Sequence, residues 1–472
     1  MTVSTKTEDG PWASRQHRRT VLLIVTVVTT AILFDGYDLV VYGAVLPQLL
    51  SDPTQIGEIS AQTGGLLGSY ALIGVLIGSL GAGAIGDRVG RRRVMLVAAV
   101  WFSLGMGLTA MTQSITSFGV LRFLTGIGVG MIVATGGAIV AEFAPADRRN
   151  LFNAITYSGI PAGGFMASVL AMVFLSDIGW RGMFFIGAAP LLFLVPMIWF
   201  WLPESPRWLS LVGRQNQAER LCEQYGLPPE QFAQENVAKR SSATTVKELP
   251  EKRGFAALFS RRYIAGTTLI GLMSFIGLLL TYGLNTWLPE IMRGQGEDAD
   301  GSLGFLLVLN GGAIGGVLIA SVFADRVGPK RIVATTFLIA AMSLLLIPLG
   351  MPVGLLYIFV ALAGVGAIGT QVLVYGFSAN YYGTEARAAG VAWCAGFGRL
   401  GGILGPIIGG TIVGLNLGAE AAFYIFSGFA ALGCVFTSMI PKAPPGVQKN
   451  ATEVRVEGED DFVRETAKVE TS

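Results

Sequence analysis

Twelve apolar runs follow one another along the 472-residue chain, and each is long enough to cross the hydrocarbon core of a bilayer. A membrane-spanning helix needs about 20 consecutive apolar residues. Helices are the only spanning structure that fits, because barrel strands would show alternating segments of about ten residues instead. We therefore predict an all-α membrane protein with twelve transmembrane helices. The predicted spans cover residues 21–46, 61–85, 94–113, 117–142, 152–175, 182–202, 263–288, 302–324, 332–350, 353–380, 389–414 and 420–440.

The composition is typical of helices packed in a membrane and argues against a soluble globular protein. Hydrophobic residues make up 52% of the chain and charged residues only 14%, and its 64 glycines allow membrane helices to approach closely. A cleavable signal peptide is not expected, because the first apolar run is too long and lacks a small-residue cleavage pattern. The net charge of +2 gives no reason to expect a nucleic-acid partner.

The positions of the basic residues predict how the chain is oriented. Of the 33 Lys and Arg residues, Arg122 and Arg399 lie inside spans. Arg181 and Arg293 lie in loops on one side of the membrane, and all the others fall on the opposite side if the helices alternate in direction. Because Lys and Arg are retained on the cytoplasmic side, we expect both termini and the longest loop to be cytoplasmic.

The two halves of the chain repeat each other. Asp87-Arg88-Val89-Gly90 returns as Asp325-Arg326-Val327-Gly328. The same spacing carries Gly126 and Gly128 onto Gly364 and Gly366, Asp147 onto Glu385, Arg149 onto Arg387, and Gly163-Gly164 onto Gly401-Gly402. Such agreement indicates two parallel repeats of six helices, related by an axis along the membrane normal.

The repeat and the polar segments together divide the chain into five parts. The predicted division is a cytoplasmic N-tail at 1–20, an N-terminal six-helix bundle at 21–202, a cytoplasmic central loop at 203–262, a C-terminal six-helix bundle at 263–440 and a cytoplasmic C-tail at 441–472. Within the central loop, RQNQAERLCEQYG predicts a short polar helix. The C-tail is polar and acidic, which predicts disorder.

Three motifs carry a resemblance to a known family. GAIGDRVGRRR, at Gly83–Arg93, joins spans two and three with glycines for a tight turn and arginines for cytoplasmic charge. RFLTGIGVG, at Arg122–Gly130, buries an arginine in span four, and PESPRWL follows span six at Pro203–Leu209. With the second copy of the loop motif, these segments resemble the major facilitator superfamily over residues 20–440. The resemblance implies a twelve-helix transporter that works by alternating access.

Four further segments resemble one branch of that superfamily, the aromatic acid:proton symporters. They are DGYD at Asp35–Asp38, GWRGMF at Gly179–Phe184, YGLNTWLP at Tyr282–Pro289 and GRLGGILGP at Gly398–Pro406. This resemblance implies a bacterial inner-membrane importer of benzoate, a hydroxybenzoate, protocatechuate or gentisate. SGIPAGG, at Ser158–Gly164, departs from it, because that segment resembles a motif associated with antiporters.

Ionisable residues inside the spans are few, and such residues usually face a cavity or a partner because charge is costly in lipid. Asp35 and Asp38 lie one helical turn apart on one face of span one. Two carboxylates so close in a low dielectric should not both ionise freely, so we expect either one to hold a proton near physiological pH. Arg122 and Glu142 of span four are further candidates for proton coupling, because the sole histidine, His17, lies outside the spans.

Arg399 is the candidate for binding an anionic substrate. It lies about halfway along span eleven, where its planar fork of donors can hold a carboxylate through two hydrogen bonds. Aromatic and amide side chains on other spans could surround a hydroxylated ring. These candidates are Tyr42, Tyr282, Asn285, Trp287, Asn310, Gln371, Tyr375 and Trp393. The alternatives are an Arg399 bonded to helix carbonyls and aromatic residues in the interfacial belt.

A charged gate is expected at the cytoplasmic ends of the helices. Its candidates are Asp87, Arg88, Arg91, Asp325 and Arg326, which lie in the two copies of the loop motif. The family resemblance implies that such residues open and close the cytoplasmic side as the two repeats rock around a fixed site. The alternative is that these charges only set topology and solubility.

The sequence therefore predicts a proton-coupled importer of an aromatic carboxylate that works as a monomer, without a cofactor or a metal. An enzyme is not expected, because no nucleophile, metal cluster or nucleotide loop accompanies the spans, and Cys222, Cys394 and Cys434 show no disulfide or metal spacing. Two alternatives stay open. One is a transporter of another organic acid or a sugar, in either direction, and the other is a nutrient receptor, which would be expected to carry a larger soluble part.

Overall fold

The computed structural model describes residues 15–145, 149–227, 254–383, 386–415 and 417–442. Every regular element within them is a helix, as predicted. The α-helices are α1 Arg15–Ser51, α2 Ala61–Val89, α3 Arg91–Ala110, α4 Ile115–Phe143, α5 Arg149–Tyr157, α6 Gly159–Ala188, α7 Pro190–Trp201, α8 Pro206–Leu211, α9 Gln215–Tyr225, α11 Phe255–Leu258, α12 Ile264–Gly294, α13 Ala299–Val327, α14 Pro329–Leu346, α15 Val353–Gly364, α16 Thr370–Tyr381, α17 Arg387–Gly414 and α18 Ala419–Met439. A 3-10 turn, η2, covers Ile347–Leu349, and a π-helical turn, η3, covers Val365–Gly369.

Some predictions fall outside the residues that the structure describes. They are the N-tail before residue 15, the C-tail after residue 442, the middle of the central loop at 228–253, and the repeat partners Asp147 and Glu385. The described part of the central loop includes α9, which lies where the short polar helix was predicted.

Eleven helical segments of the described chain are long and apolar enough to span a bilayer, and one of them holds two spans. That segment, Leu151–Trp201, has 51 residues and would be about 77 Å long if straight, against a hydrocarbon core of about 30 Å. It turns at Gly179, whose φ of 62° and ψ of −178° define a backbone conformation open essentially to glycine. The fold therefore has twelve spans, and the fifth and sixth meet at this turn.

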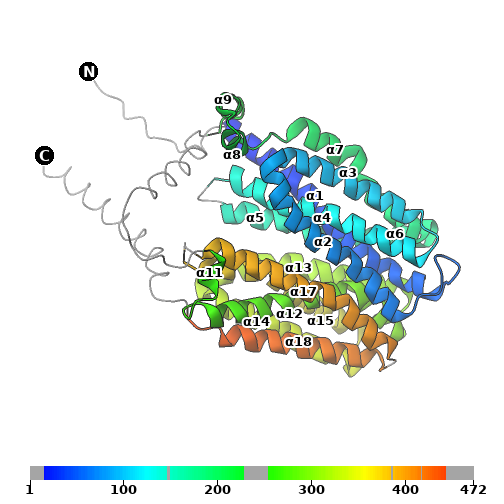
Figure 1. The fold of residues 1–472 in the computed structure, drawn as a ribbon. Helices are drawn as coiled ribbons and strands as arrows, with labels where there is room; N and C mark the ends of the chain where they lie inside the picture. The colour runs from blue at the N-terminus through cyan, green and yellow to red at the C-terminus, as the bar shows by residue number, and fades with distance from the viewer. Residues whose placement is uncertain (1–14, 146–148, 228–253, 384–385, 416, 443–472) are drawn as a thin grey trace, which may run out of the picture.

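Two groups of helices lie side by side with their axes running in roughly the same direction (Figure 1). The N-terminal group contains α1–α7 and the C-terminal group contains α12–α18. The groups touch mainly through α2 and α17, α6 and α13, and α1 and α12. We name the end of the molecule at Arg15 and Met439 the terminal end, and the end at Ser51 and Ala61 the distal end.

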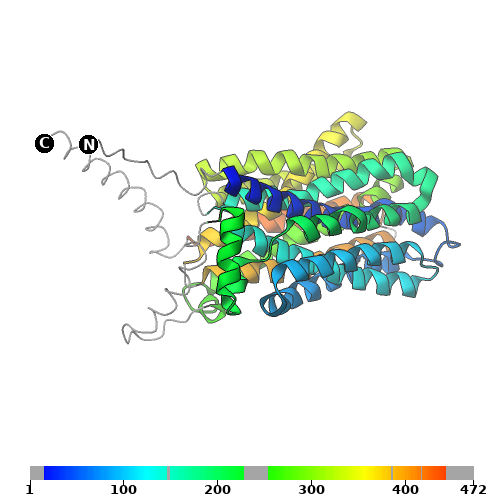
Figure 2. The same cartoon turned by 90° about the horizontal axis from the view of Figure 1, so that it is seen from above.

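At the terminal end, the last residues of α9 lie beside the start of α1 (Figure 2). Gln16 Nε2 donates to the Gln224 carbonyl over 2.6 Å, and Thr20 Oγ1 donates to the Tyr225 carbonyl over 3.1 Å. These bonds attach the described part of the central loop to the N-terminal group.

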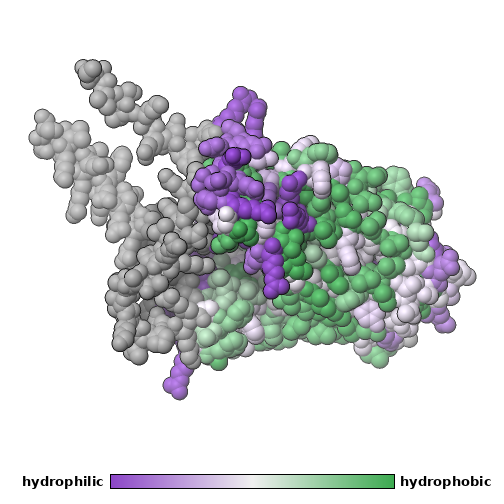
Figure 3. Space-filling model, turned by 45° about the horizontal axis from the view of Figure 1, so that its top comes forward, coloured by the Kyte–Doolittle hydropathy of each residue, from purple (hydrophilic) through white to green (hydrophobic). Residues whose placement is uncertain are grey.

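The outer surface between the two ends is broadly hydrophobic, with hydrophilic residues gathered toward the ends (Figure 3). Large apolar side chains stand outward on the helices, as Leu80 and Leu192 do with 71% and 81% of their surfaces exposed. So much exposed apolar surface is unfavourable in water but matches a lipid environment. This surface is therefore the one that faces the bilayer.

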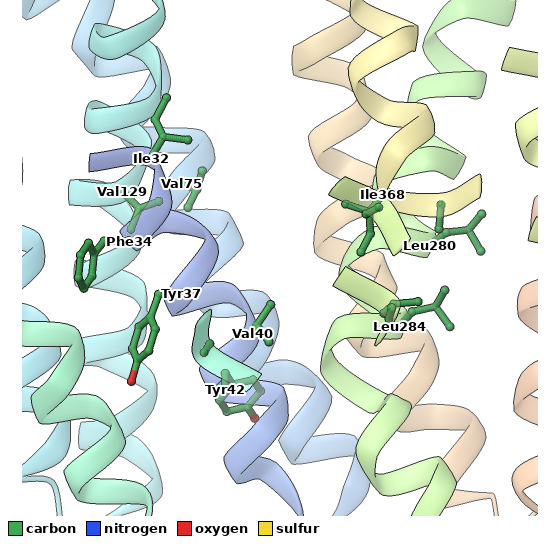
Figure 4. Close-up of a cluster of buried hydrophobic side chains, with 14 of the residues drawn as sticks. Ile32, Phe34, Tyr37, Val40, Tyr42, Val75, Val129, Leu280, Leu284 and Ile368 are labelled. Carbon is green, nitrogen blue, oxygen red and sulfur yellow. The ribbon is translucent and has the colours of Figure 1, made fainter. Parts of the chain in front are cut away.

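Apolar side chains fill the interior of each group (Figure 4). Phe34 and Tyr37 of α1 lie in the N-terminal group, whereas Leu280 and Leu284 of α12 lie beside Ile368 of η3 in the C-terminal group. The Tyr37 ring is fully buried, and its hydroxyl donates to a backbone carbonyl of α6 over 2.7 Å. This bond satisfies the one polar group of the buried side chain. Each group is thus packed around its own interior.

Glycines bring the two groups together in the distal half of the molecule. A Cβ atom at Gly43 would lie 1.9 Å from the Asn285 carbonyl oxygen, and one at Gly65 would lie 2.5 Å from that of Pro406. Nearby, Ser69 Oγ donates across the groups to the carbonyl of α17 at residue 403, over 2.6 Å. Only glycine allows backbones to approach this closely. We name the set Gly43, Gly65, Ser69, Asn285, Ile403 and Pro406 the distal seal.

The tenth span is not a regular α-helix. α15 passes into the π-helical turn η3 and continues as α16. The matching span of the first repeat, α4, is continuous over Ile115–Phe143. A π turn adds a residue to one turn, rotates the faces of the helix that follows, and is frequent at functional sites. Gln371 and Tyr375 lie on that following helix.

Candidate functional site

A buried ion pair joins α1 to α4. Arg122 donates to the carboxylate of Asp38, and the two residues are 2% and 4% exposed. The Arg122 guanidinium also lies over the rings of Tyr42, at 5.2 Å from the centroid, and Phe184, at 5.7 Å. An unpaired ion in this position would carry a large desolvation penalty. The pair therefore compensates both charges inside the N-terminal group.

Asp35 lies one turn before Asp38 but has a different environment. It is partly exposed and lines the same cavity as Asp38 and Arg122. It makes no ion pair with any residue that the structure describes. The polar residues that line this cavity are Asp35, Asp38, Tyr42, Arg122, Tyr282 and Thr286. The two aspartates, equivalent in the sequence, are thus one paired and one unpaired carboxylate.

Arg399 of the C-terminal group lies near Asp35, but it is not among the residues that line the cavity. It lies on α17, is partly exposed, and interacts electrostatically with Asp35. Its guanidinium also interacts electrostatically with three tyrosines, which are Tyr157, Tyr282 and Tyr375. No carboxylate in the described part of the chain is close enough to form an ion pair with it. Its donors are therefore available to an anion.

The predicted amide side chains bond within the C-terminal group. Asn310 Nδ2 donates to Asn285 Oδ1 over 2.9 Å, and Asn285 Nδ2 donates to the Thr281 carbonyl over 2.8 Å. Gln371 Nε2 donates to Ser274 Oγ over 3.1 Å. Asn285, Asn310 and Gln371 are all buried, and none of them lines the cavity beside Asp35.

The predicted aromatic residues divide between the cavity and the helix packing. Tyr42 and Tyr282 line the cavity, and the Tyr42 hydroxyl donates to the carbonyl of Gly64 over 2.6 Å. The indole N–H groups of Trp287 and Trp393 donate to backbone carbonyls of α17 and α12, over 2.8 Å and 2.9 Å. The structure therefore uses both tryptophans to join helices of the C-terminal group.

The predicted gate residues lie toward the terminal end. Arg91 pairs with Glu142 at 2.6 Å, and Ser205 Oγ donates to the same carboxylate over 2.6 Å. Glu142 lies in the last turn of α4, about 30 Å of helix rise from Arg122, so the structure does not bring it together with Asp35. Of the remaining gate candidates, Asp87, Arg88 and Arg326 are exposed, and the side chain of Asp325 lies outside what the structure describes.

The predicted set omits several residues in or near the cavity, among them Thr286, Phe184 and Tyr157. Thr286 follows Tyr282 by one helical turn, so helical spacing alone could have indicated it. Phe184 covers Arg122 through a contact between distant spans, which no local pattern signals. Tyr157 precedes Pro161 by four residues, and a proline at that spacing indicates a helix break.

The sequence matches the Major Facilitator Superfamily over residues 28–318 and 298–467. The chain belongs to this superfamily. The benzoate transport protein of Acinetobacter baylyi is 32% identical over 92% of this chain and 94% of that protein. A gallate transporter of Pseudomonas putida is 33% identical over 85% and 87%. The 4-hydroxybenzoate transporter PcaK of Pseudomonas aeruginosa is 31% identical over 84% and 87%.

Solved structures show the same superfamily fold. An inward-open structure of the xylose transporter XylE from E. coli has a TM-score of 0.71 at 20% identity, and the match covers 90% of this chain and 97% of that one. The resemblance predicted from the motifs is confirmed. This superfamily member is a multi-pass membrane transporter and not an enzyme. No group of three or more His, Cys, Asp and Glu side chains suited to a metal is found among the described residues.

Proposed function

We propose that this superfamily member imports an aromatic carboxylate together with protons, by alternating access. The observation that carries the proposal is an unpaired carboxylate, Asp35, within electrostatic reach of an unpaired guanidinium, Arg399, between the two groups of helices. A proton acceptor and a cation for the anion are the two parts that a proton–anion symporter needs. The benzoate, gallate and 4-hydroxybenzoate transporters among the relatives support an aromatic acid as the substrate.

In the proposed cycle, Asp35 rather than Asp38 carries the proton. Asp38 pairs with Arg122, whereas Asp35 has no ion-pair partner among the described residues. Ionised Asp35 competes with the substrate for the positive field of Arg399, and a proton taken up from outside removes that competition. Arg399 then binds the substrate carboxylate through two hydrogen bonds. Proton and substrate therefore favour the same loaded state, which couples their movement.

The substrate ring is proposed to lie among tyrosines. Tyr157, Tyr282 and Tyr375 all interact electrostatically with Arg399. Their rings offer apolar faces to an aromatic ring, and their hydroxyls offer hydrogen bonds to polar substituents. A cation with tyrosines near it suits an aromatic anion better than it suits a neutral sugar.

The orientation proposed from the basic residues places the terminal end in the cytoplasm of a bacterium, with the protein working as a monomer in the inner membrane. The distal seal then closes the outer side of the site. Arg91 and Glu142 belong to the cytoplasmic side, where their contact would form part of the gate. We assign the other gate roles to charges of the two loop motifs, which are Asp87, Arg88, Asp325 and Arg326.

Uptake by the purified protein in proteoliposomes tests this proposal. Radiolabelled benzoate, 4-hydroxybenzoate, gallate and gentisate are supplied with and without an inward proton gradient, and we expect the gradient to drive accumulation. Asp35→Asn should abolish that accumulation. Asp52→Asn, which changes a partly exposed carboxylate in the loop after α1, should not.

Two outcomes would contradict different parts of the proposal. If the Asp35→Asn variant still accumulated substrate with proton uptake intact, Asp35 would not be the coupling residue. If no aromatic acid were transported or competed for uptake, while xylose or a dicarboxylate did, the substrate class would be wrong.

Export in exchange for protons is a second candidate function. The break between α5 and α6 falls within SGIPAGG, the segment that resembles an antiporter motif. Reversing the proton gradient separates the two directions. A symporter loses accumulation when the inside is acidic, whereas a proton antiporter gains it.

A further inference from the structure

The two repeats carry a tyrosine on different spans. At the spacing that relates the repeats, Tyr375 of the second half matches Gly137 of α4, and Tyr157 at the end of α5 matches Ala395. In space, the Tyr157 hydroxyl occupies the place that the missing side chain leaves, because a Cβ atom at Gly137 would lie 2.2 Å from it. Tyr157 and Tyr375 therefore approach Arg399 from different spans of the two groups.

Local structure explains how Tyr157 reaches this position. Pro161 has no N–H to donate to the carbonyl of Tyr157, four residues earlier, so α5 ends there and α6 starts at Gly159. The Tyr157 side chain is partly buried and interacts electrostatically with Arg399, Asp35 and Tyr375. Its hydroxyl makes no hydrogen bond to any residue that the structure describes. A donor group is thus available on the N-terminal side of the region that Arg399 faces.

We propose that the Tyr157 hydroxyl donates a hydrogen bond to the substrate carboxylate that Arg399 holds, so that the anion bridges the two groups of helices. Tyr375 supplies the corresponding hydroxyl from the C-terminal group. This inference rests on the proposed import of a carboxylate, and it adds the residue through which the N-terminal group recognises the ligand. A ligand held from both sides links the two groups of helices in the loaded state.

Because the Tyr157 hydroxyl contacts Gly137, substitutions on two helices, α5 and α4, can change its position. Tyr157→Phe removes the hydroxyl. Gly137→Ala keeps the Tyr157 hydroxyl but adds a methyl group at the position that this hydroxyl occupies, so the hydroxyl must move. A hydrogen bond to a charged group is worth about 1.5–3 kcal/mol, which corresponds to a factor of about ten or more in affinity.

The experiment is a double-variant cycle on benzoate uptake in proteoliposomes under an inward proton gradient. We expect KM to rise about tenfold in Tyr157→Phe, while the maximal rate per protein stays within about twofold of the wild type. Gly137→Ala should raise KM to a similar extent. The double variant should be no worse than Tyr157→Phe alone, because removing the hydroxyl makes room for the methyl group.

Matched controls use residues away from this region. Tyr357→Phe removes the hydroxyl of a tyrosine that stacks on Phe305, and Gly428→Ala adds a methyl group where no atom lies within 4 Å. Both should leave KM unchanged. They show whether a missing tyrosine hydroxyl or an added methyl group in a span is disruptive in itself.

The results separate this inference from the proposed function. An unchanged KM in Tyr157→Phe overturns the inference while the wild type still transports benzoate. Additive losses in the double variant also overturn it, because the two changes would then act at separate places. A wild type that takes up none of the aromatic acids refutes the proposed function itself.

Discussion

The two groups of helices treat buried charge in different ways. In the N-terminal group, Arg122 and Asp38 compensate each other within the helices. In the C-terminal group, Arg399 has no ion-pair partner in the described chain, and polar residues such as Asn285 and Asn310 bond to each other. The two six-helix repeats therefore differ in their charged residues. The N-terminal group holds an ion pair, and the C-terminal group holds a cation without an ion-pair partner among the described residues.

The fourth and tenth spans show the same contrast in their backbones. α4 is a continuous helix, which keeps Arg122 in register with Asp38 on α1. The tenth span contains the π turn η3 just before the segment that carries Tyr375. Regular geometry thus accompanies the fixed ion pair, and an irregular turn accompanies the residues that face Arg399.

The largest expected effect comes from removing the ion pair of the N-terminal group, and it is an effect on stability. Arg122→Ala should lower the free energy of unfolding by about 3–5 kcal/mol, because Asp38 would be left buried without its partner. Thermal unfolding in detergent measures this loss. The double variant Arg122→Gln with Asp38→Asn should recover most of it, since no buried charge remains. A single variant as stable as the wild type would show that the pair does not hold these charges.

The corresponding change in the C-terminal group should affect transport and leave stability nearly unchanged. Arg399→Ala is expected to reduce benzoate uptake on the order of 100-fold, because the substrate carboxylate loses its two hydrogen bonds. Arg399→Lys should not restore uptake, since an ammonium group cannot replace the planar fork. Parallel melting curves provide the comparison. A destabilisation as large as that of Arg122→Ala would remove the proposed difference between the two groups.

A smaller effect is expected at the distal seal, where the two groups meet. Gly65→Leu places a side chain against the Pro406 carbonyl and should hold the groups apart at that end. A cysteine introduced at Ser69 should then react several-fold faster with a membrane-impermeant maleimide added from the distal side. Gly81→Leu is the matched control, because the space around Gly81 is nearly empty. Equal labelling rates in the two leucine variants would contradict a seal at Gly65.

The smallest expected effect concerns the distal loop of the N-terminal group. Hydrogen bonds from Thr54 and Gln55 hold the pKa of Asp52 below its ordinary value. Gln55 in turn accepts hydrogen bonds from Trp180 and Arg181, so the loop is attached to the turn between spans five and six.

A carboxyl group whose folded pKa is lowered stabilises the fold above its unfolded pKa, and this contribution is lost as the pH falls through the folded pKa. We therefore expect the melting temperature of the wild type to fall slightly more between about pH 6 and about pH 3 than that of Asp52→Asn. Identical pH profiles would show that the hydrogen bonds of Asp52 do not contribute to stability.

The fold could be predicted from the sequence because span length and repetition are properties of the chain itself. The apolar runs predicted an all-helical protein with twelve spans, and the motifs predicted its superfamily. Even the turn at Gly179 falls between two predicted spans, at 152–175 and 182–202. Each of these features depends on local composition and helix geometry.

The site could be predicted only in part, because its geometry depends on contacts between distant spans. Asp35 and Asp38 share one face of α1, so only the position of Arg122 on another helix decides which of them is paired. Glu142 was a further candidate for proton coupling, and only the structure shows that it pairs with Arg91 at the terminal end. Trp287 looked like a lining residue but donates its N–H group within the helix packing.

The distal seal also has a genetic consequence. All glycine codons share their first two bases, so any change in either base adds a side chain or ends the chain. At Gly43 and Gly65 that side chain would have to occupy the place of a carbonyl oxygen from the other group. A random mutant library screened for protein at normal levels that no longer transports should therefore be enriched in single-base changes at these codons. The proteins that such alleles encode would keep the binding region intact, but their two groups of helices would be held apart at the distal end.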